Sequence, residues 1–248
     1  MKLIRSCVLI VLLYLNFSCP VQAQLQDTTN QRQKISSFIL PAAFIGYGLL
    51  SLGEKNLFSE LDRTTRDELQ EDHPLFAAHA DDYLQFAPAA AVYGLHIAGI
   101  KGRHDLADAT GLYFLSEAIM AGTVRGLKSW THRLRPNGSA FNSFPSGHTA
   151  NAFASAEFLN QEYKSTHPWI GYAGYTVATA TGILRMYNNK HWLSDVVAGA
   201  GFGILSTKIS YLIYPKLKRL VLGRAGSNYN LMPTYQQNTF GVMFSGRF

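Results

Sequence analysis

The chain has 248 residues, a formal net charge of +6 and only two cysteines. This length suits one domain with a sizeable core, and the modest basic excess favours anionic surfaces or substrates such as lipid head groups. The basic residues are scattered except for Lys216, Lys218, Arg219 and Arg224, and they form no aromatic-interleaved patch of the kind that is typical of nucleic-acid grooves. We therefore expect no nucleic acid among its partners.

Residues 1–23 have the build of a cleavable secretory signal. Lys2 and Arg5 precede an apolar run, Val8 to Leu15, and small and polar residues follow. The run is too short to cross a hydrocarbon layer of about 30 Å as a first membrane helix. Both cysteines lie in this segment, so cleavage after residue 23 would leave no thiol for a disulfide or a metal. The alternative is a lipoprotein in which Cys19 becomes the lipidated first residue. We expect an exported protein of the cell envelope whose site faces the periplasm.

Hydrophobic periodicity predicts one helical domain. Residues 24–35 are polar and Gln-rich, which predicts a flexible lead, and the domain is expected over residues 36–224 as an all-α bundle of six core helices. These helices are expected at residues 38–53, 84–100, 110–127, 148–160, 169–185 and 196–214. Residues 57–69 place leucines among charged residues and predict an amphipathic surface helix. The tail, residues 225–248, alternates apolar with small or polar residues near its end and predicts a short β-hairpin.

The expected helices lie near the boundary between membrane and soluble bundles. Most are shorter than the roughly 20 residues that span a bilayer. Small residues such as Gly199, Gly201 and Gly203 permit close helix contacts in either setting. We favour a membrane-embedded or membrane-associated domain, because the polar lead and tail lower the mean hydropathy of the whole chain.

Two cations form the first candidate cluster. Lys128 lies near the end of an expected helix, and Arg135 follows on a loop, where Pro136 disfavours helix at the preceding residue. A guanidinium fork can bind two phosphate oxygens, and Lys128 would add a point charge. The alternative is a pair of cations stabilised by the C-terminal end of a helix dipole.

The second cluster is a turn that opens a helix. Pro145 and Gly147 force the turn, and the free backbone N–H groups of the following helix face a potential anion. Ser146 reads as a helix cap, which does not prevent its hydroxyl from touching a phosphate. A charged His148 in the first helical turn is disfavoured by the positive end of the dipole, so acid catalysis explains it better than a structural role.

The third cluster contains Arg185, His191 and Asp195. The last two are four residues apart, which predicts that the carboxylate reaches one imidazole nitrogen and presents the other as a base or nucleophile. The alternative is an exposed pair at the start of a helix. Asn188 and Asn189 predict a turn that brings Arg185 and His191 together.

Together the three clusters resemble the signature of the type 2 phosphatidic acid phosphatase (PAP2) superfamily, which also includes bacterial acid phosphatases and vanadium-dependent haloperoxidases. The internal spacings match: Lys, six residues, Arg-Pro; Pro-Ser-Gly-His; Arg, five residues, His, three residues, Asp. The match covers Lys128 to Asp195. One departure is Leu184, where the family usually has a small residue before the arginine.

The resemblance implies phosphoryl transfer without a metal or another cofactor. His191 would attack phosphorus to form a phosphohistidine, Asp195 would orient its ring, and His148 would protonate the leaving alkoxide and later act as a base toward water. The phosphoryl oxygens would be held by Lys128, Arg135, Ser146, Gly147 and Arg185. The other histidines have no ligand at metal-site spacing.

We therefore expect a metal-independent phosphatase of a phosphomonoester or pyrophosphate. Apolar helices beside the site favour a lipid: phosphatidate, phosphatidylglycerophosphate, a polyprenyl pyrophosphate or lipid A. The alternatives are a soluble periplasmic acid phosphatase, a vanadium-dependent haloperoxidase and a non-catalytic envelope module. The short chain has no obvious region for peroxide and halide, which argues against the haloperoxidase, and the nearly complete signature argues against the module.

Overall fold

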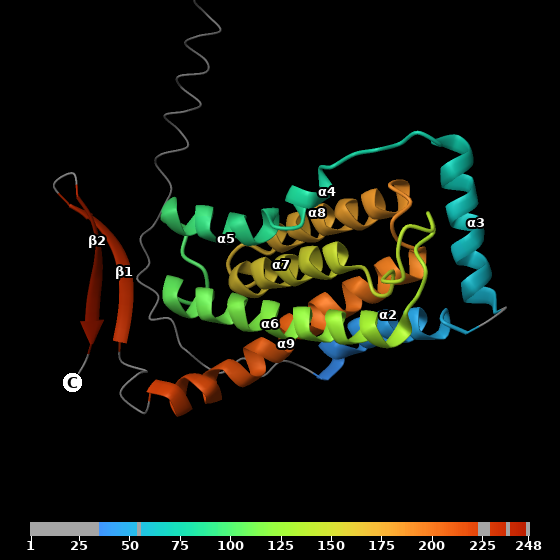
Figure 1. The fold of residues 1–248 in the computed structure, drawn as a ribbon. Coiled ribbons are helices and arrows are strands. Elements are labelled where there is room, and N and C mark those ends of the chain that lie inside the picture. Colours follow the sequence, from blue (N-terminus) through green and yellow to red (C-terminus); the bar gives the residue numbers. More distant parts are fainter. Residues whose placement is uncertain (1–34, 54–55, 223–228, 237–238, 247–248) are drawn as a thin grey trace, which may run out of the picture. The chain divides into compact units, whose positions relative to one another are not determined.

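The computed structural model describes residues 35–53, 56–222, 229–236 and 239–246. The predicted signal and almost all of the predicted flexible lead lie outside these residues. The described chain contains a helical bundle and a two-stranded hairpin (Figure 1). All six predicted core helices form, as does the predicted amphipathic helix.

The helices follow one another in this order: η1 (Ile35–Phe38), α2 (Ile39–Leu50), α3 (Leu57–Asp72), α4 (Asp81–Leu84), α5 (Ala87–Ile97), α6 (Leu106–Thr131), α7 (Gly147–Tyr163), α8 (Pro168–Tyr187) and α9 (Leu193–Leu222). The hairpin pairs β1 (Tyr229–Gln236) with β2 (Thr239–Gly246) in antiparallel register. The fold is thus an all-α bundle with a short C-terminal hairpin.

Helix α7 is the centre of the bundle, packed against α5, α6, α8 and α9 (Figure 1). Thirteen of its 17 residues are buried, polar ones included. Glu157 is one of them, and its carboxylate accepts a 2.7 Å hydrogen bond from the Lys208 ammonium of α9. Because such a charge is costly to bury alone, this pairing explains how a partly polar helix occupies the core.

Two glycines let α9 pack directly on the first turns of α7. A Cβ added at Gly199 would lie 2.7 Å from the carbonyl oxygen of Ser146, and one added at Gly203 would lie still closer to the carbonyl oxygen of Ala150. Neither position can accept a side chain unless the helices separate. The close approach fixes the start of α7 beside the start of α9.

Helix α9 is longer than predicted. The sequence analysis ended this helix at residue 214, but it continues through Pro215 to Leu222. Side chains on both sides of the proline hold it to α6: the Tyr214 hydroxyl donates to Asp108 Oδ1 at 3.1 Å, and Lys218 Nζ donates to the same atom at 2.6 Å. These tertiary contacts outweigh the helix-breaking tendency of proline.

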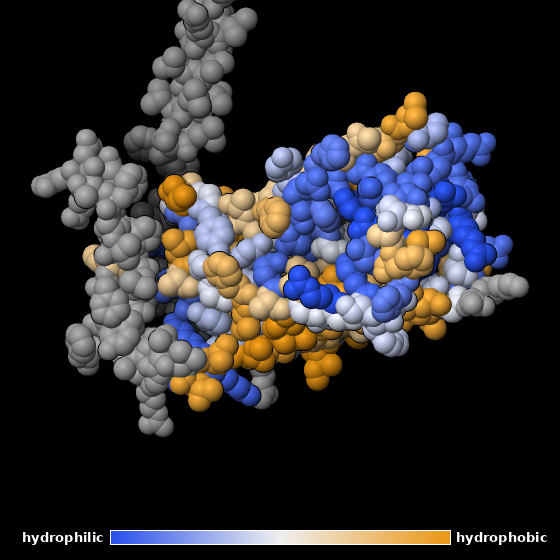
Figure 2. Space-filling view, viewed as in Figure 1, coloured by the Kyte–Doolittle hydropathy of each residue, from blue (hydrophilic) through white to orange (hydrophobic). Residues whose placement is uncertain are grey.

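Among the described residues, one helix is long and apolar enough to cross a membrane, namely Leu193–Leu220, and 61% of its most apolar window is buried inside the bundle. Figure 2 shows apolar side chains gathered along the lower edge of the bundle in this view, over α2, α6 and α9. Exposed large apolar residues on these helices include Leu49, Leu50, Phe114, Trp130, Leu212 and Leu220.

Candidate functional site

The three sequence clusters meet where α7 and α9 begin and α6 and α8 end. The backbone N–H of Ser146 donates to the carbonyl oxygen of Asp195 at 3.0 Å, which ties the second cluster to the third. The loop between α6 and α7 closes the group, because the carbonyl oxygen of Ser143 lies 2.8 Å from Nδ1 of His191. Residues that are up to 67 positions apart therefore form one site.

The turn before α7 forms an anion cradle. Ser146 is the N-cap of α7, as predicted: its hydroxyl accepts from the backbone N–H of Thr149 at 3.4 Å and lies 2.9 Å from Thr149 Oγ1. A Cβ added at Gly147 would meet only Val124 Cγ1 at 3.9 Å and Lys128 Cε at 4.0 Å. The glycine thus leaves space beside the lysine at the positive end of the helix.

Lys128 and Arg135 are held by one residue of the loop. Lys128 Nζ donates to the carbonyl oxygen of Asn142, and Arg135 Nε donates to Asn142 Oδ1 at 2.8 Å. Burial, together with the nearby charges of Arg135 and Arg185, lowers the pKa of Lys128 to about 8. Mutual repulsion among these three cations would be relieved by an anion bound between them.

Arg185 lies in the last turn of α8 and is 8% exposed. Its Nη1 donates to Asp81 Oδ2 of α4 at 2.6 Å, and Asp81 also accepts from Asn188 Nδ2 at 3.2 Å. Its Nε is buried and has no hydrogen-bond partner in the part of the chain that the structure describes. A buried, unpaired N–H of a cation is costly and indicates a place for an anionic oxygen.

His191 is buried, with one ring nitrogen occupied. Nδ1–H donates to the carbonyl oxygen of Ser143 at 2.8 Å, which leaves Nε2 as the atom with a free lone pair. Burial lowers the pKa of His191 to about 4, although the carboxylate of Asp195 opposes this shift, so the ring is neutral at pH 7. A neutral imidazole with a fixed tautomer is a competent nucleophile.

Asp195 has more partners than the predicted pairing with His191. Its Oδ2 lies 3.7 Å from Nδ1 of His191, so the backbone carbonyl makes the short bond to the ring and the carboxylate lies behind it. The carboxylate accepts from Arg133 Nη1 at 2.7 Å, from the Ser143 hydroxyl, and from the backbone N–H of Trp192 at 2.9 Å. The carboxylate therefore reaches His191 at ion-pair distance, and its shorter hydrogen bonds come from these three donors.

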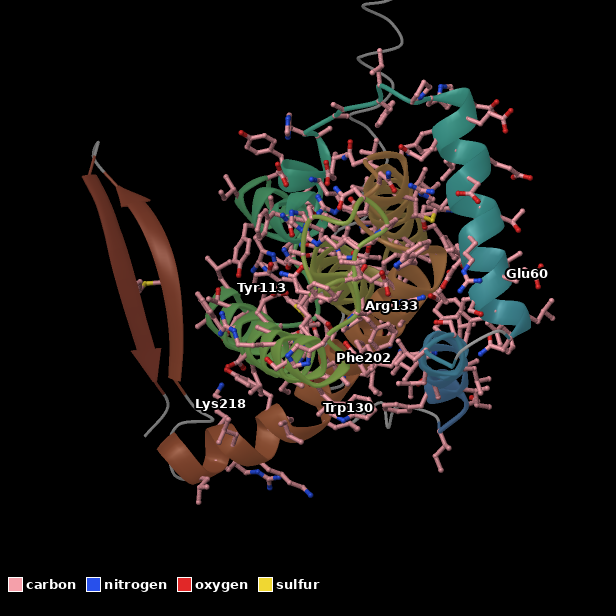
Figure 3. All side chains as sticks on the ribbon, turned by 45° about the vertical axis from the view of Figure 1, so that its right-hand side comes forward. Glu60, Tyr113, Trp130, Arg133, Phe202 and Lys218 are labelled. Carbon is pink, nitrogen blue, oxygen red and sulfur yellow. The ribbon has the colours of Figure 1, made fainter. Side chains whose placement is uncertain are left out.

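Arg133 links Asp195 to α3. Its Nη2 donates to Asp62 Oδ2 at 2.7 Å, while Asp62 also accepts from the backbone N–H and the hydroxyl of Ser194 at 2.8 and 2.5 Å. The guanidinium extends from the α6–α7 loop toward α3 (Figure 3). Its Cζ lies 5.7 Å from the centre of the Trp192 ring. Two buried carboxylates thus share one arginine.

Helix α4 supplies two adjacent carboxylates to the site. Asp81 binds Arg185, as described above, and Asp82 Oδ1 lies 2.9 Å from Nε2 of His148. Burial and the charge of Arg185 lower the pKa of His148, and Asp82 opposes the shift. Ligand atoms of Asp81, Asp82 and His148 lie within 4.8 Å of one another, a closeness that these two ion pairs explain.

Residues 109–219 match the family model of the PAP2 superfamily. The chain carries a PAP2 superfamily domain. This match agrees with the resemblance carried by the three sequence clusters, and all eight predicted site residues lie inside the PAP2 domain.

The PAP2 domain has curated bacterial relatives. The chain is 43% identical over 162 residues to lipid A 1-phosphatase of Porphyromonas gingivalis, covering 63% of this chain and 35% of that protein. It is 38% identical over 93 residues to phosphatidylglycerophosphatase B of Bacillus subtilis and 37% identical over 76 residues to bacitracin transport permease protein BcrC of Bacillus licheniformis. These matches cover 32% and 31% of this chain, respectively. The chain spans 35% to 45% of the length of these relatives.

Two solved structures are similar to this chain. One is a transmembrane PAP2 type phosphatidylglycerolphosphate phosphatase from Bacillus subtilis, with a TM-score of 0.47 and 22% identity, covering 73% of this chain and 98% of that chain. The other is LpxE of Aquifex aeolicus, with a TM-score of 0.44 and 21% identity, covering 58% of this chain and 92% of that chain.

Four residues around the PAP2 signature were missed by the sequence analysis: Asp62, Asp81, Asp82 and Arg133. The three aspartates precede the matched region, and acidic residues there are also typical of a solvated helix surface. One indication for Arg133 was present in the sequence: it lies two positions before Arg135 in the same loop and could therefore have been expected near the site.

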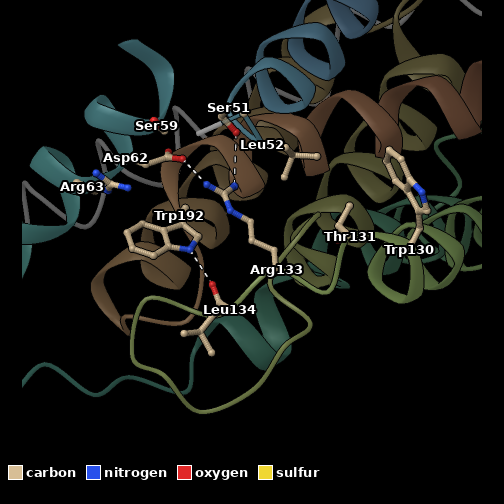
Figure 4. Close-up of a pocket in the computed structure, with 11 residues that line it drawn as sticks. Ser51, Leu52, Ser59, Asp62, Arg63, Trp130, Thr131, Arg133, Leu134 and Trp192 are labelled. Atoms are coloured by element: carbon tan, nitrogen blue, oxygen red, sulfur yellow. Dashed lines mark hydrogen bonds and ion pairs between the residues drawn. The ribbon is translucent and has the colours of Figure 1, made fainter. Parts of the chain in front are cut away.

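A hollow of about 580 Å³ lies beside the PAP2 site, on the side of Arg133 and Trp192 (Figure 4). It is lined by Ser51, Leu52, Gly53, Ser59, Asp62, Arg63, Trp130, Thr131, Arg133, Leu134 and Trp192. None of the eight predicted site residues lines it, so this hollow and the anion cradle are separate features.

Proposed function

We propose that this protein is a phosphatase of lipid phosphates that works through a phosphohistidine at His191. The observation that carries the proposal is the buried Nε of Arg185, which has no hydrogen-bond partner among the described residues. It lies in a site with two further cations, the N-terminal turn of α7 and a neutral histidine. A phosphoryl group would satisfy the unpaired N–H and the cationic charge together.

In the first half-reaction, Nε2 of His191 attacks phosphorus and the bond between phosphorus and the leaving oxygen breaks. His148, protonated at the start, gives its proton to that oxygen. Lys128, Arg135, Arg185 and the first N–H groups of α7 stabilise the charge on the phosphoryl oxygens. The Ser143 carbonyl and the Asp195 carboxylate stabilise the positive charge that the His191 ring gains.

In the second half-reaction, water attacks phosphorus and the bond between phosphorus and Nε2 breaks. The now neutral His148 takes the proton from the water, and phosphate leaves. His191 returns to its neutral form with Nδ1–H still bound to the Ser143 carbonyl. Each half-reaction moves one proton through His148, and no metal enters either step.

Two findings support a lipid as the carrier of the phosphate. The relative at 43% identity is a lipid A 1-phosphatase, and another relative is a phosphatidylglycerophosphatase. The exposed apolar residues on α2, α6 and α9 would suit contact with a membrane (Figure 2). We propose a membrane-associated enzyme whose site faces the periplasmic side.

The test is phosphate release by detergent-extracted protein from a panel of lipid phosphates and one soluble ester, with excess chelator throughout. We expect turnover to survive chelation and to fall to the uncatalysed rate in His191→Ala. His167→Ala, which removes an exposed histidine, should retain wild-type turnover. After an alkaline quench, labelled phosphate should remain on wild-type protein and be absent from His191→Ala.

Three results would refute parts of this proposal. Turnover that persists in His191→Ala would rule out a phosphohistidine at His191. Turnover that is lost on chelation would rule out the metal-independent mechanism. A soluble ester cleaved far better than every lipid phosphate would remove the lipid substrate.

A further inference from the structure

His148 has one ring nitrogen occupied and one free. Nε2 lies 2.9 Å from Asp82 Oδ1, and Nδ1 makes no hydrogen bond in the part of the chain that the structure describes. The proposed reaction requires this ring first to give and then to receive a proton, so the nitrogen that faces the substrate must be fixed. The PAP2 signature contains no residue that fixes it.

We infer that Asp82 is a positioning residue for His148: by accepting Nε2–H it sets the tautomer and leaves Nδ1 to exchange protons with the leaving group and with water. This inference rests on the proposed phosphatase function. It assigns Asp82, outside the region that matches the family, a role in proton transfer, although Asp82 itself touches no reacting atom.

When a substrate binds, His148 carries protons on both nitrogens. Nδ1–H passes to the leaving oxygen as its bond to phosphorus breaks, and Nε2–H stays on the hydrogen bond to Asp82. In the second half-reaction, the lone pair of Nδ1 takes a proton from the attacking water. Asp82 stays ionised throughout, because it only accepts a hydrogen bond.

The two carboxylates of α4 have different surroundings, which separates a positioning role from a structural one. Asp81 is 1% exposed and binds Arg185 and Asn188, so it anchors α4 on the end of α8. The side chain of Asp82 is 49% exposed, and its ion-pair partners among the described residues are His148, at 2.9 Å, and His79, at 3.7 Å. Asp82 therefore contributes little to packing, and its main effect is on the tautomer and protonation of the His148 ring.

The charges around His148 explain why such a partner is useful. Arg185 disfavours the protonated ring, whereas Asp82 and Asp81 favour it. A general acid must be protonated when the substrate arrives, and it sits here among cations that hold the phosphate. The carboxylate of Asp82 offsets their repulsion.

The experiment compares two esters that differ only in their need for a proton. An alkyl or lipid phosphate has a poor leaving group that needs a general acid, whereas p-nitrophenyl phosphate has a good one that does not. We expect Asp82→Ala to lower kcat on the alkyl ester about 100-fold and to change kcat on p-nitrophenyl phosphate less than about threefold. On the alkyl ester, the kcat of Asp82→Asn should lie between those of wild type and Asp82→Ala, because the amide oxygen can still accept the hydrogen bond from Nε2–H of His148.

Asp81→Asn is the contrasting variant. It loosens Arg185, which would contact the phosphoryl group in both esters, so it should lower both rates by a similar factor. Glu71→Gln, at an exposed position of α3, should leave both rates unchanged. Equal losses on the two esters in Asp82→Ala would overturn the inference.

A second measurement needs no turnover. Ring ¹⁵N spectra of wild-type protein, with the His148 signals identified by their loss in His148→Ala, should show the Nε2–H tautomer at neutral pH, and Asp82→Ala should lose this preference. An Nδ1–H tautomer in wild type, or an unchanged tautomer in Asp82→Ala, would overturn the inference. If wild type cleaved no ester, the proposed function would fail, and these spectra would still decide the role of Asp82.

Discussion

Replacing Arg133 with methionine would remove the cation shared by two buried carboxylates while keeping a long side chain. Nη1 and Nη2 of Arg133 each donate at 2.7 Å, to Asp195 and Asp62 respectively, and these aspartates are 0% and 2% exposed. Removing one member of a buried ion pair costs about 3–5 kcal/mol, because the remaining charge is left without compensation. We expect Arg133→Met to lower the free energy of unfolding by about that amount.

Denaturant unfolding of detergent-solubilised variants measures the effect. Adding Asp62→Asn to Arg133→Met removes one of the two uncompensated charges, so we expect a coupling energy of about 1–3 kcal/mol between the two changes. Arg66→Met is the matched control, since Arg66 pairs with Asp67 at the surface and should change stability by less than about 1 kcal/mol. A loss below about 1 kcal/mol in Arg133→Met would refute the argument that Arg133 holds a buried charge network.

Three further outcomes are expected. Gly203→Ala should lower the unfolding temperature, because its Cβ would collide with the carbonyl oxygen of Ala150. Gly46→Ala should leave the unfolding temperature unchanged, because its Cβ would meet nothing within 4 Å. Equal effects of the two changes would contradict the packing argument. The pH profile of kcat/KM should have an acidic optimum. The value should rise as His191 loses its proton near its pKa of about 4, and it should fall as His148 loses its proton, because the pKa of His148 lies below the ordinary value of about 6.5. An alkaline optimum would contradict these roles. Folding lowers the pKa of His191, so between pH 6.5 and 4 the unfolded chain binds a proton that the folded chain does not. The free energy of unfolding should therefore fall by about 3 kcal/mol as the pH drops from 6.5 to 4. A His191→Asn variant whose free energy of unfolding has the same pH dependence would contradict this.

The site could be predicted to the extent that its chemistry is local in sequence. Lys128 and Arg135 are seven residues apart, and Ser146 to His148 form a single turn, so residue type and spacing alone indicated an anion cradle. The partners of these groups could not be predicted in the same way. Asp82 is 66 positions from His148, and an aspartate in a polar stretch gives no sign of the ring it will contact.

The helices were predictable where an apolar face repeats over several turns. Their ends were not, because contacts between distant residues decide them. The predicted end of α9 at residue 214 was too early, because Tyr214 and Lys218 hold the helix on Asp108. The pairing of Asp195 with His191 was inferred from spacing alone, which could not show that Arg133 binds the same carboxylate or that the Ser143 carbonyl makes the shorter bond to the ring.

The position of the three aspartates limits how far the chain can be shortened. Asp62, Asp81 and Asp82 all precede residue 109, where the match to the family begins. A fragment that started there would keep every signature residue, but Arg185 and His148 would lose Asp81 and Asp82, and Arg133 would lose Asp62 and retain only Asp195. The smallest autonomous piece of this protein with an intact site therefore starts upstream of α3, well outside the limits that family membership alone would draw.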